Sequence, residues 1–433
     1  MVLNPIIDEF LARYLIKLRT KKFDRQMKPI RLLSTILLFS VVLFGCTDTD
    51  IKTNRKIQRI HNDLFTVDAH SASAINFLYK KNFDPARLND FGSFDYPRME
   101  QGGLDACFFA IFPGGSIRGE SNIDVIFKRI EKTVDAIAKS IADNPDIVEA
   151  ALHPDDGYRI AKEGKKAIYM GVESGLAINT VEMVKEYFDM GIRYMTLCFN
   201  KNSLLCDSST DPKGAEHNGV SQLGMDVIEE MNRLGMMIDV SNVSDKSFND
   251  ILEHSKAPVI VSHSACRALC SNHRNISDEM LLRLKGNGGV VNITLLSQLL
   301  KSPGVDNSIQ QKLSDLEENY KELIGADPVR YLDEYNRERE RIVKESGQNA
   351  SVADLVDHID HVIQVIGIDY VGISSDFDGG GGVDGCKDVS EIENITKELV
   401  LRGYSRSEIK KIWGGNFMRV FREVTKVAER KYF

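Results

Sequence analysis

The chain has 433 residues, of which 42% are hydrophobic and 27% are charged, and its formal net charge at pH 7 is −8. This composition is that of a globular protein of one or two domains and excludes an intrinsically disordered chain. The negative charge argues against a nucleic-acid partner.

The N-terminus has the pattern of an export signal. The basic residues Lys28 and Arg31 precede an apolar run, LLSTILLFSVVLFG, which is short for a bilayer core of ~30 Å but has the length of a signal peptide. The run ends in LFGC, which resembles the bacterial lipoprotein cleavage box, with Cys46 as the lipidated residue. We therefore expect a leader and lipoprotein signal peptide at 1–45 and a tether at 46–56. The predicted product is an exported lipoprotein, anchored to a membrane and facing the periplasm or the cell surface.

From residue 57 onward, short β-rich segments are separated mostly by amphipathic helical stretches. The apolar residues of the β-rich segments are nearly continuous, which is typical of parallel strands buried on both faces. Stretches such as 122–142 and 352–367 carry apolar residues at i, i+3 and i+4, as helices packed on one side do. Eight β-then-α units predict a (β/α)8 barrel that forms a single domain over 57–433. The predicted strands are 64–70, 105–112, 166–174, 193–200, 236–242, 258–264, 288–296 and 370–378.

A charged, helix-forming segment at 297–350 interrupts the repeat between the seventh and eighth predicted strands. Its composition favours a solvated helical insertion, and a lid or a dimer contact is the alternative. Farther on, His358 and His361 lie three residues apart on a predicted outer helix. We expect them on a solvated face, away from any metal site.

Polar residues gather where the predicted strands end. In such barrels the carboxyl ends of the strands form the active-site face, so these side chains are expected to converge. Zinc binds imidazole nitrogen and carboxylate oxygen, and two histidines with two acids therefore indicate a metal-assisted hydrolase. The strand-end residues are His70, Glu173, Asn200, Asn242, His263 and Asp376.

Several longer motifs resemble the membrane (renal) dipeptidase family of zinc metallopeptidases. They include DYPRMEQGG (95–103), MGVESG (170–175), KAPVIVSHSACRALCSNHRNISDE (256–279) and DYVGISSDFDG (369–379). The resemblance covers nearly all of residues 57–423. It implies a (β/α)8 barrel that hydrolyses dipeptides at two zinc ions, commonly as a homodimer, with small peptides as the binding partners.

The resemblance also implies roles for individual residues. His70 matches a metal ligand, Glu173 matches the carboxylate that bridges both ions, and His263 matches a ligand of the second ion. Asp376 matches the catalytic acid that handles the proton beside the metals, and Arg274 matches a residue that contacts the substrate.

Four positions depart from the family pattern. Ala72 stands in place of an aspartate ligand, and Asn242 in place of a histidine ligand. Phe199 replaces the histidine that polarises the substrate, and Leu296 replaces an aromatic residue. Because each zinc site has lost one ligand, we expect one weakly held zinc ion in place of two.

Two functions follow from this sequence. In the first, the protein is a metallo-dipeptidase with a degraded site, in which His70, Glu173 and His263 hold zinc and Asp376 acts as the base. In the second, it is a catalytically inactive, lipid-anchored pseudoenzyme that binds peptides or another protein. Hydrolysis of a different amide is a third alternative.

Overall fold

The computed structural model describes residues 48–80, 82–114, 120–302, 307–326, 331, 334–335, 337–339, 341–342 and 349–429. Its large compact unit comprises Ile57–Phe433, and a smaller unit comprises Met1–Lys56. The predicted signal peptide and Cys46 lie outside the described residues, whereas residues 48–56 belong to helix α3 (Asp48–Asn62). Among the residues that are described, no helix is long and apolar enough to span a bilayer.

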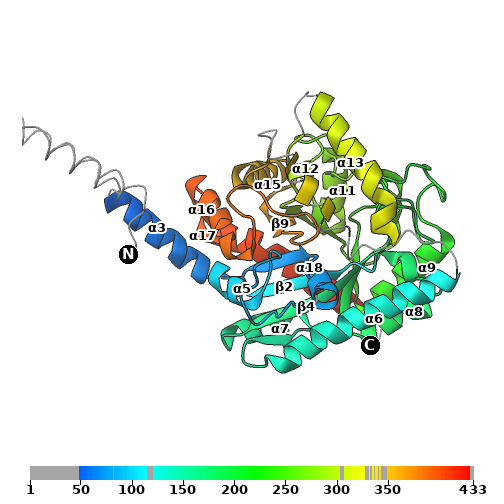
Figure 1. Ribbon diagram of the computed structural model, residues 1–433, viewed down its shortest axis with the longest axis horizontal. Coiled ribbons are helices and arrows are strands. Elements are labelled where there is room, and N and C mark those ends of the chain that lie inside the picture. The colour runs from blue at the N-terminus through cyan, green and yellow to red at the C-terminus, as the bar shows by residue number, and fades with distance from the viewer. Residues whose placement is uncertain are drawn as a thin grey trace, which may run out of the picture. The chain divides into compact units, whose positions relative to one another are not determined.

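Eight parallel strands form a nearly closed barrel with helices around it (Figure 1). The strand order is β1-β2-β4-β5-β6-β7-β8-β9, and the backbone N–H of Asp376, after β9, donates to the carbonyl of His70 in β1 at 2.8 Å. These eight strands confirm the predicted barrel. The additional strand β3 pairs with β4 outside this order and was not predicted. The strands are β1 Val67–Ser71, β2 Ala106–Ile111, β3 Val148–Ala150, β4 Lys166–Glu173, β5 Ile192–Thr196, β6 Met237–Asp239, β7 Ile260–Ser264, β8 Val290–Thr294 and β9 Val371–Ser374.

Several helices begin and end where the sequence supplies capping residues. Ser221, Ser244 and Ser277 each accept a hydrogen bond from a backbone N–H of the first turn that follows, and Gly235 and Gly288 end two of these helices in the left-handed conformation. The helices are α4 Ala74–Tyr79, α5 Tyr96–Gly102, α6 Glu120–Asp143, α7 Pro154–Lys162, α8 Glu182–Asp189, α9 Gln222–Leu234, α10 Asp245–His254, α11 Asp278–Asn287, α12 Ser297–Leu300, α13 Asn307–Ala326, α15 Val352–Ile366, α16 Glu393–Leu401, α17 Arg406–Lys410 and α18 Asn416–Glu429.

Apolar side chains fill one end of the barrel. The residues at the amino ends of the strands form a buried cluster with the apolar face of α18. Within it, the ring of Phe108 stacks on Tyr169 with centroids 4.4 Å apart and meets Phe417 of α18 edge-on at 4.9 Å. Because this end is packed with hydrocarbon, the polar strand-end residues collect at the opposite, carboxyl end.

The insertion between β8 and β9 is helical where it is described, in α12 and α13, as the sequence predicts. The prediction that His358 lies on a solvated face is wrong, because its side chain is buried. Its Nδ1 accepts from the backbone N–H of Cys266 at 2.9 Å, and its Nε2 donates to the carbonyl of Leu300 at 2.9 Å. His358 thus ties the loop after β7 to the start of the insertion, while His361 lies partly exposed beside Asp278.

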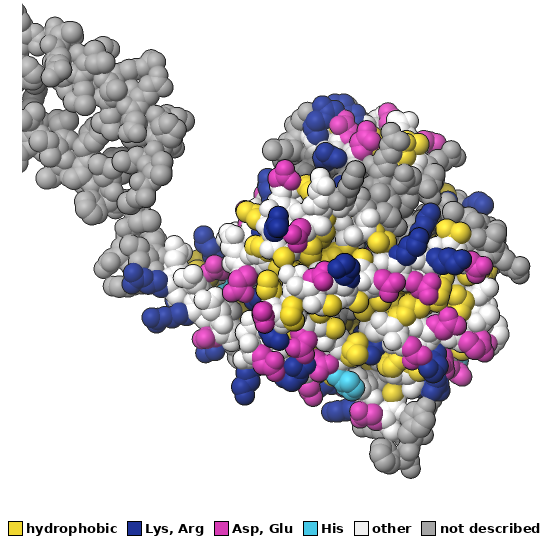
Figure 2. All heavy atoms as spheres, turned by 60° about the horizontal axis from the view of Figure 1, so that its bottom comes forward, with side chains coloured by type: hydrophobic (Ala, Val, Ile, Leu, Met, Phe, Trp, Pro, Cys, Tyr) yellow, Lys and Arg dark blue, Asp and Glu magenta, His cyan; other side chains and the backbone are white. Residues whose placement is uncertain are grey.

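The surface carries both signs of charge. Figure 2 shows a face on which acidic and basic side chains are intermingled around small apolar areas.

Candidate metal centre

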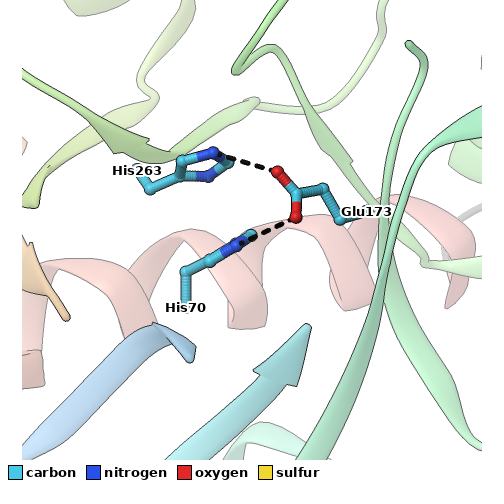
Figure 3. Close-up of side chains that lie close together, drawn as sticks. All are labelled: His70, Glu173 and His263. Atoms are coloured by element: carbon cyan, nitrogen blue, oxygen red, sulfur yellow. Dashed lines mark ion pairs between the residues drawn. The ribbon is translucent and has the colours of Figure 1, made fainter. Parts of the chain in front are cut away.

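Three predicted metal ligands converge at the carboxyl end of the barrel (Figure 3). His70 lies in β1, Glu173 ends β4 and His263 lies in β7, and all three side chains are buried. The two carboxylate oxygens of Glu173 face different histidines. Oε2 lies 3.7 Å from Nε2 of His70, and Oε1 lies 3.2 Å from Nε2 of His263. Glu173 therefore has a bridging position between two imidazoles.

The His70 side of this cluster fits a metal cation. Nε2 of His70 is buried and has no hydrogen-bond partner, and it lies 3.8 Å from Oδ1 of Asp376. Separations of 3.7 and 3.8 Å are too long for hydrogen bonds, but they suit ligands that each lie ~2.0–2.2 Å from one zinc ion. Burial alone would lower the pKa of His70, yet Glu173 and Asp376 raise it above its ordinary value. The position therefore favours a positive charge.

The His263 side is occupied by the protein's own groups. A guanidinium N–H of Arg274 donates to Nε2 of His263 at 2.8 Å, and the side-chain amide of Asn242 donates to Oε1 of Glu173 at 3.4 Å. Burial and the neighbouring His70 lower the pKa of His263 to about 4, so its imidazole is neutral and accepts this bond. The sequence predicted a substrate contact for Arg274, and the structure places its guanidinium on Nε2 of His263, a predicted metal-ligand atom.

Ser262 fixes the orientation of both histidines. Its hydroxyl donates to Oδ2 of Asp239 at 2.6 Å, and its oxygen lies 2.8 Å from Nδ1 of His263 and 3.1 Å from Nδ1 of His70. Since the hydroxyl proton is given to Asp239, the oxygen accepts from both Nδ1–H groups. Both Nε2 lone pairs then face Glu173, which is the arrangement that a metal site needs.

Two residues of β5 extend this network across the barrel. The hydroxyl of Tyr194 lies 3.0 Å from Nδ1 of His70, and Thr196 donates to Oδ2 of Asp239 at 2.6 Å. The Tyr194 ring passes so close to Gly171 that a Cβ there would lie 2.2 Å from it. These supports were not predicted. Their signal was the presence of two hydroxyl side chains, Tyr194 and Thr196, two positions apart in β5, where alternate residues share the inner face.

The backbone around the cluster is strained. Ser174, Asn242, Asp376 and Asp378 have positive φ angles of 139°, 70°, 52° and 65°, and each follows a barrel strand. Such conformations cost on the order of 1–3 kcal/mol each and persist at sites where the surrounding structure holds them. The strand ends thus hold residues other than glycine at positive φ angles. Burial raises the pKa of Asp376 to about 7, whereas the neighbouring imidazoles of His263 and His70 outweigh burial and hold the pKa of Glu173 well below its usual range.

The remaining predicted positions comprise three apolar residues that depart from the family pattern and one further strand-end residue. Ala72 is buried after β1, close to Asp376, since a Cβ on Gly379 would lie 2.8 Å from Ala72 and 2.3 Å from Oδ1 of Asp376. Phe199 packs its ring against Phe112 with centroids 4.8 Å apart, so no polar group occupies that position. Leu296 is buried at the start of α12. Asn200 is exposed and does not join the cluster.

Comparison with known proteins identifies the family. Residues 54–432 match the family described as membrane dipeptidase, peptidase family M19. The chain belongs to this family. It is 33% identical to dipeptidase tcpJ of Claviceps purpurea over 360 residues, covering 82% of this chain and 74% of the relative. It is 31% identical to human dipeptidase 3 over 376 residues, covering 85% of this chain and 65% of the relative.

The solved structures agree with this assignment. The probable dipeptidase PvdM from Pseudomonas aeruginosa superimposes with a TM-score of 0.76 at 30% identity, over 87% of this chain and 99% of that one. The family consists of metallopeptidases, for which zinc is the typical ion. In this member of the membrane dipeptidase family, His70, Glu173 and His263 form a group that could hold such an ion.

Proposed function

We propose that this protein is a metal-dependent dipeptidase with a reduced site that holds one zinc ion weakly, through His70 and Glu173, within the cluster of His70, Glu173 and His263. The observation that carries the proposal is the buried, unpartnered Nε2 of His70, which faces the carboxylates of Glu173 and Asp376. Family membership and relatives named as dipeptidases support the choice of substrate class.

The residues around the cluster have complementary tasks. When bound, zinc would lower the pKa of a water molecule and polarise the peptide carbonyl. Asp376, whose carboxylate lies 3.8 Å from Nε2 of His70, could take up and return the proton beside the ion. Phe199 offers no hydrogen bond to the developing oxyanion, and such a donor is worth about 2.7–4 kcal/mol in comparable enzymes. We therefore expect slow turnover.

The alternative function is a catalytically inactive binding module for peptides. Two observations favour it: Arg274 occupies the Nε2 atom of His263, and Phe199 packs on Phe112 in place of a polar group. A barrel with these features could retain a peptide through the positive charge of Arg274 without hydrolysing it.

One experiment separates the two functions. The full chain is assayed against a panel of dipeptides over a range of zinc concentrations, with His70→Ala as the test variant and His361→Ala as the surface control. The dipeptidase proposal predicts slow hydrolysis that a chelator and His70→Ala abolish and His361→Ala preserves. Peptide binding without hydrolysis at any zinc concentration would establish the binding module.

We also propose that Cys46 is lipidated and anchors the protein to a membrane. The basic start, the apolar run and the LFGC box support this. Detergent-phase partitioning of the wild type and Cys46→Ala provides the test. The wild type should enter the detergent phase and the variant should not, and an aqueous wild type would contradict the proposal.

A further inference from the structure

We propose that Arg274 acts as an internal cation that caps His263, so that the wild-type chain leaves only the His70 side of the cluster open to a metal ion. This inference rests on the proposed function, because it concerns the same cluster. It assigns Arg274 a role in setting metal occupancy, beyond the substrate contact that the sequence implies.

His263 has a single lone pair with which it could bind a metal ion. A neutral imidazole has one N–H and one lone pair. The N–H at Nδ1 is committed to Ser262, 2.8 Å away, so the only lone pair is at Nε2. The guanidinium N–H of Arg274 already uses this lone pair at 2.8 Å. One lone pair serves either a hydrogen bond or a metal ion, and Arg274 and zinc therefore compete for the same atom.

The backbone of Arg274 is held in place, which makes the cap a built feature. The hydroxyl of Ser264 donates to the carbonyl of Arg274 at 2.8 Å, and the N–H of Arg274 donates to Oδ1 of Asn272 at 2.9 Å. The next residue, Asn275, is buried and donates to the carbonyls of Cys270 and Leu299, each at 2.8 Å. The loop after β7 is thus fixed by hydrogen bonds on both sides of Arg274.

Charge also favours the guanidinium at this position. Burial lowers the pKa of Arg274, and the carboxylates of Glu173, Asp376 and Asp239 oppose this effect by stabilising its positive charge. In a two-ion site, a second metal ion would neutralise these carboxylates. Here Arg274 supplies a fixed positive charge, and Asn242, a neutral amide, contacts the same oxygen of Glu173 that faces His263. A second ion would have to displace the guanidinium and would gain only a weak amide ligand.

A double-mutant cycle tests the cap directly. Zinc affinity is measured by competition with a chromophoric chelator for the full-length wild type, Arg274→Gln, His263→Ala and the double variant. In the wild-type background, His263→Ala should change the affinity less than about threefold, because Arg274 already occupies Nε2. In the Arg274→Gln background the same change should weaken binding more than about tenfold, since His263 has become a ligand. Equal effects in both backgrounds would overturn the proposal.

A control separates the cap from a general effect of charge. Arg283→Gln removes one positive charge from α11, where Arg283 pairs with Glu253 on the surface. It should leave zinc affinity within about twofold of the wild type, because exposed charges far from the site are screened by salt. Arg274→Gln should tighten zinc binding at least about tenfold. Equal tightening by both variants would contradict capping.

The inference and the proposed function fail in different ways. If His70→Ala leaves zinc binding unchanged, the proposed metal site is wrong. If His70→Ala abolishes binding but the cycle is additive, only the cap is wrong. Imidazole nitrogen NMR of the wild type gives a check that needs no folded Arg274 variant. The Nε2 signal of His70 should shift on zinc addition while that of His263 stays unchanged, and equal shifts of both would overturn the cap.

Discussion

The two sides of Glu173 differ in what faces each oxygen. On the Oε2 side, His70 keeps an unpartnered Nε2 atom next to a second carboxylate, that of Asp376. On the Oε1 side, Arg274 covers the corresponding atom of His263 and Asn242 contacts the carboxylate. The His70 side is open to a cation, whereas the guanidinium of Arg274 already supplies a cation on the His263 side.

The difference does not arise from the supporting network. Ser262 and Asp239 orient both histidines through the same hydroxyl, so both imidazoles have the tautomer that a metal ligand requires. It arises from Arg274 and Asn242, the two groups that contact the His263 side. On the proposed function, half of the metal capacity would be lost while the hydrogen bonds that orient both histidines remain.

Rebuilding both sides should produce the largest change. The triple variant Ala72→Asp, Asn242→His, Phe199→His should gain a second zinc ion, because an imidazole at position 242 gives that ion the ligand it needs to displace Arg274. Turnover should rise about 100- to 1,000-fold, the range for one oxyanion donor. Each single variant should recover little, because residues that act as one unit are strongly non-additive. Zinc content and kcat of the three singles and the triple provide the measurement. Full recovery by one single variant would contradict the account.

Removing the histidine ligand on the open side should reduce zinc affinity by nearly as large a factor. His70→Ala should weaken zinc binding by at least about 100-fold, the upper end of the range for residues that merely orient ligands. In the same chelator competition, His263→Ala should have little effect. If the two alanine variants lose zinc to the same extent, the two sides are equivalent and the comparison fails.

The shared support should have an intermediate effect. Ser262→Ala removes the acceptor of both Nδ1–H groups, and we expect zinc affinity to fall about 10- to 100-fold. Ser140→Ala, which removes a hydroxyl bonded to Tyr96, serves as the control for loss of a buried serine. A calorimetric titration in which both variants match the wild type would show that Ser262 does not orient the ligands.

Acid should act on the loop after β7, which carries Arg274. Burial lowers the pKa of His358, whose ring supports this loop through Cys266. The unfolded chain therefore binds a proton below about pH 6.5 that the folded chain resists, and the free energy of unfolding falls as the pH decreases, by at most about 1.4 kcal/mol per unit. Urea titrations between pH 7.5 and 5 should show this slope. His358→Gln should reduce it and His361→Gln, on the same helix, should not.

Much of the fold could be predicted from the sequence, because near-continuous apolar strands have few alternatives to a parallel barrel. Strand β3 was missed because three residues carry too little periodicity to detect. His358 was misplaced since its neighbours in sequence are charged, while its burial depends on Cys266 and Leu300, which are distant in the chain. The contact between Arg274 and His263 could not be predicted, because strand-end spacing places residues at a rim without fixing where a long side chain points.

The central claim is that the wild-type cluster holds one ion on the His70 side and an arginine on the other. A crystal structure of the zinc-soaked protein, with anomalous scattering recorded at the zinc edge, tests it most directly. The account predicts one anomalous peak within ~2.2 Å of both Nε2 of His70 and a carboxylate oxygen of Glu173, with Arg274 still bonded to His263. Two peaks flanking Glu173, with Arg274 displaced, would contradict it.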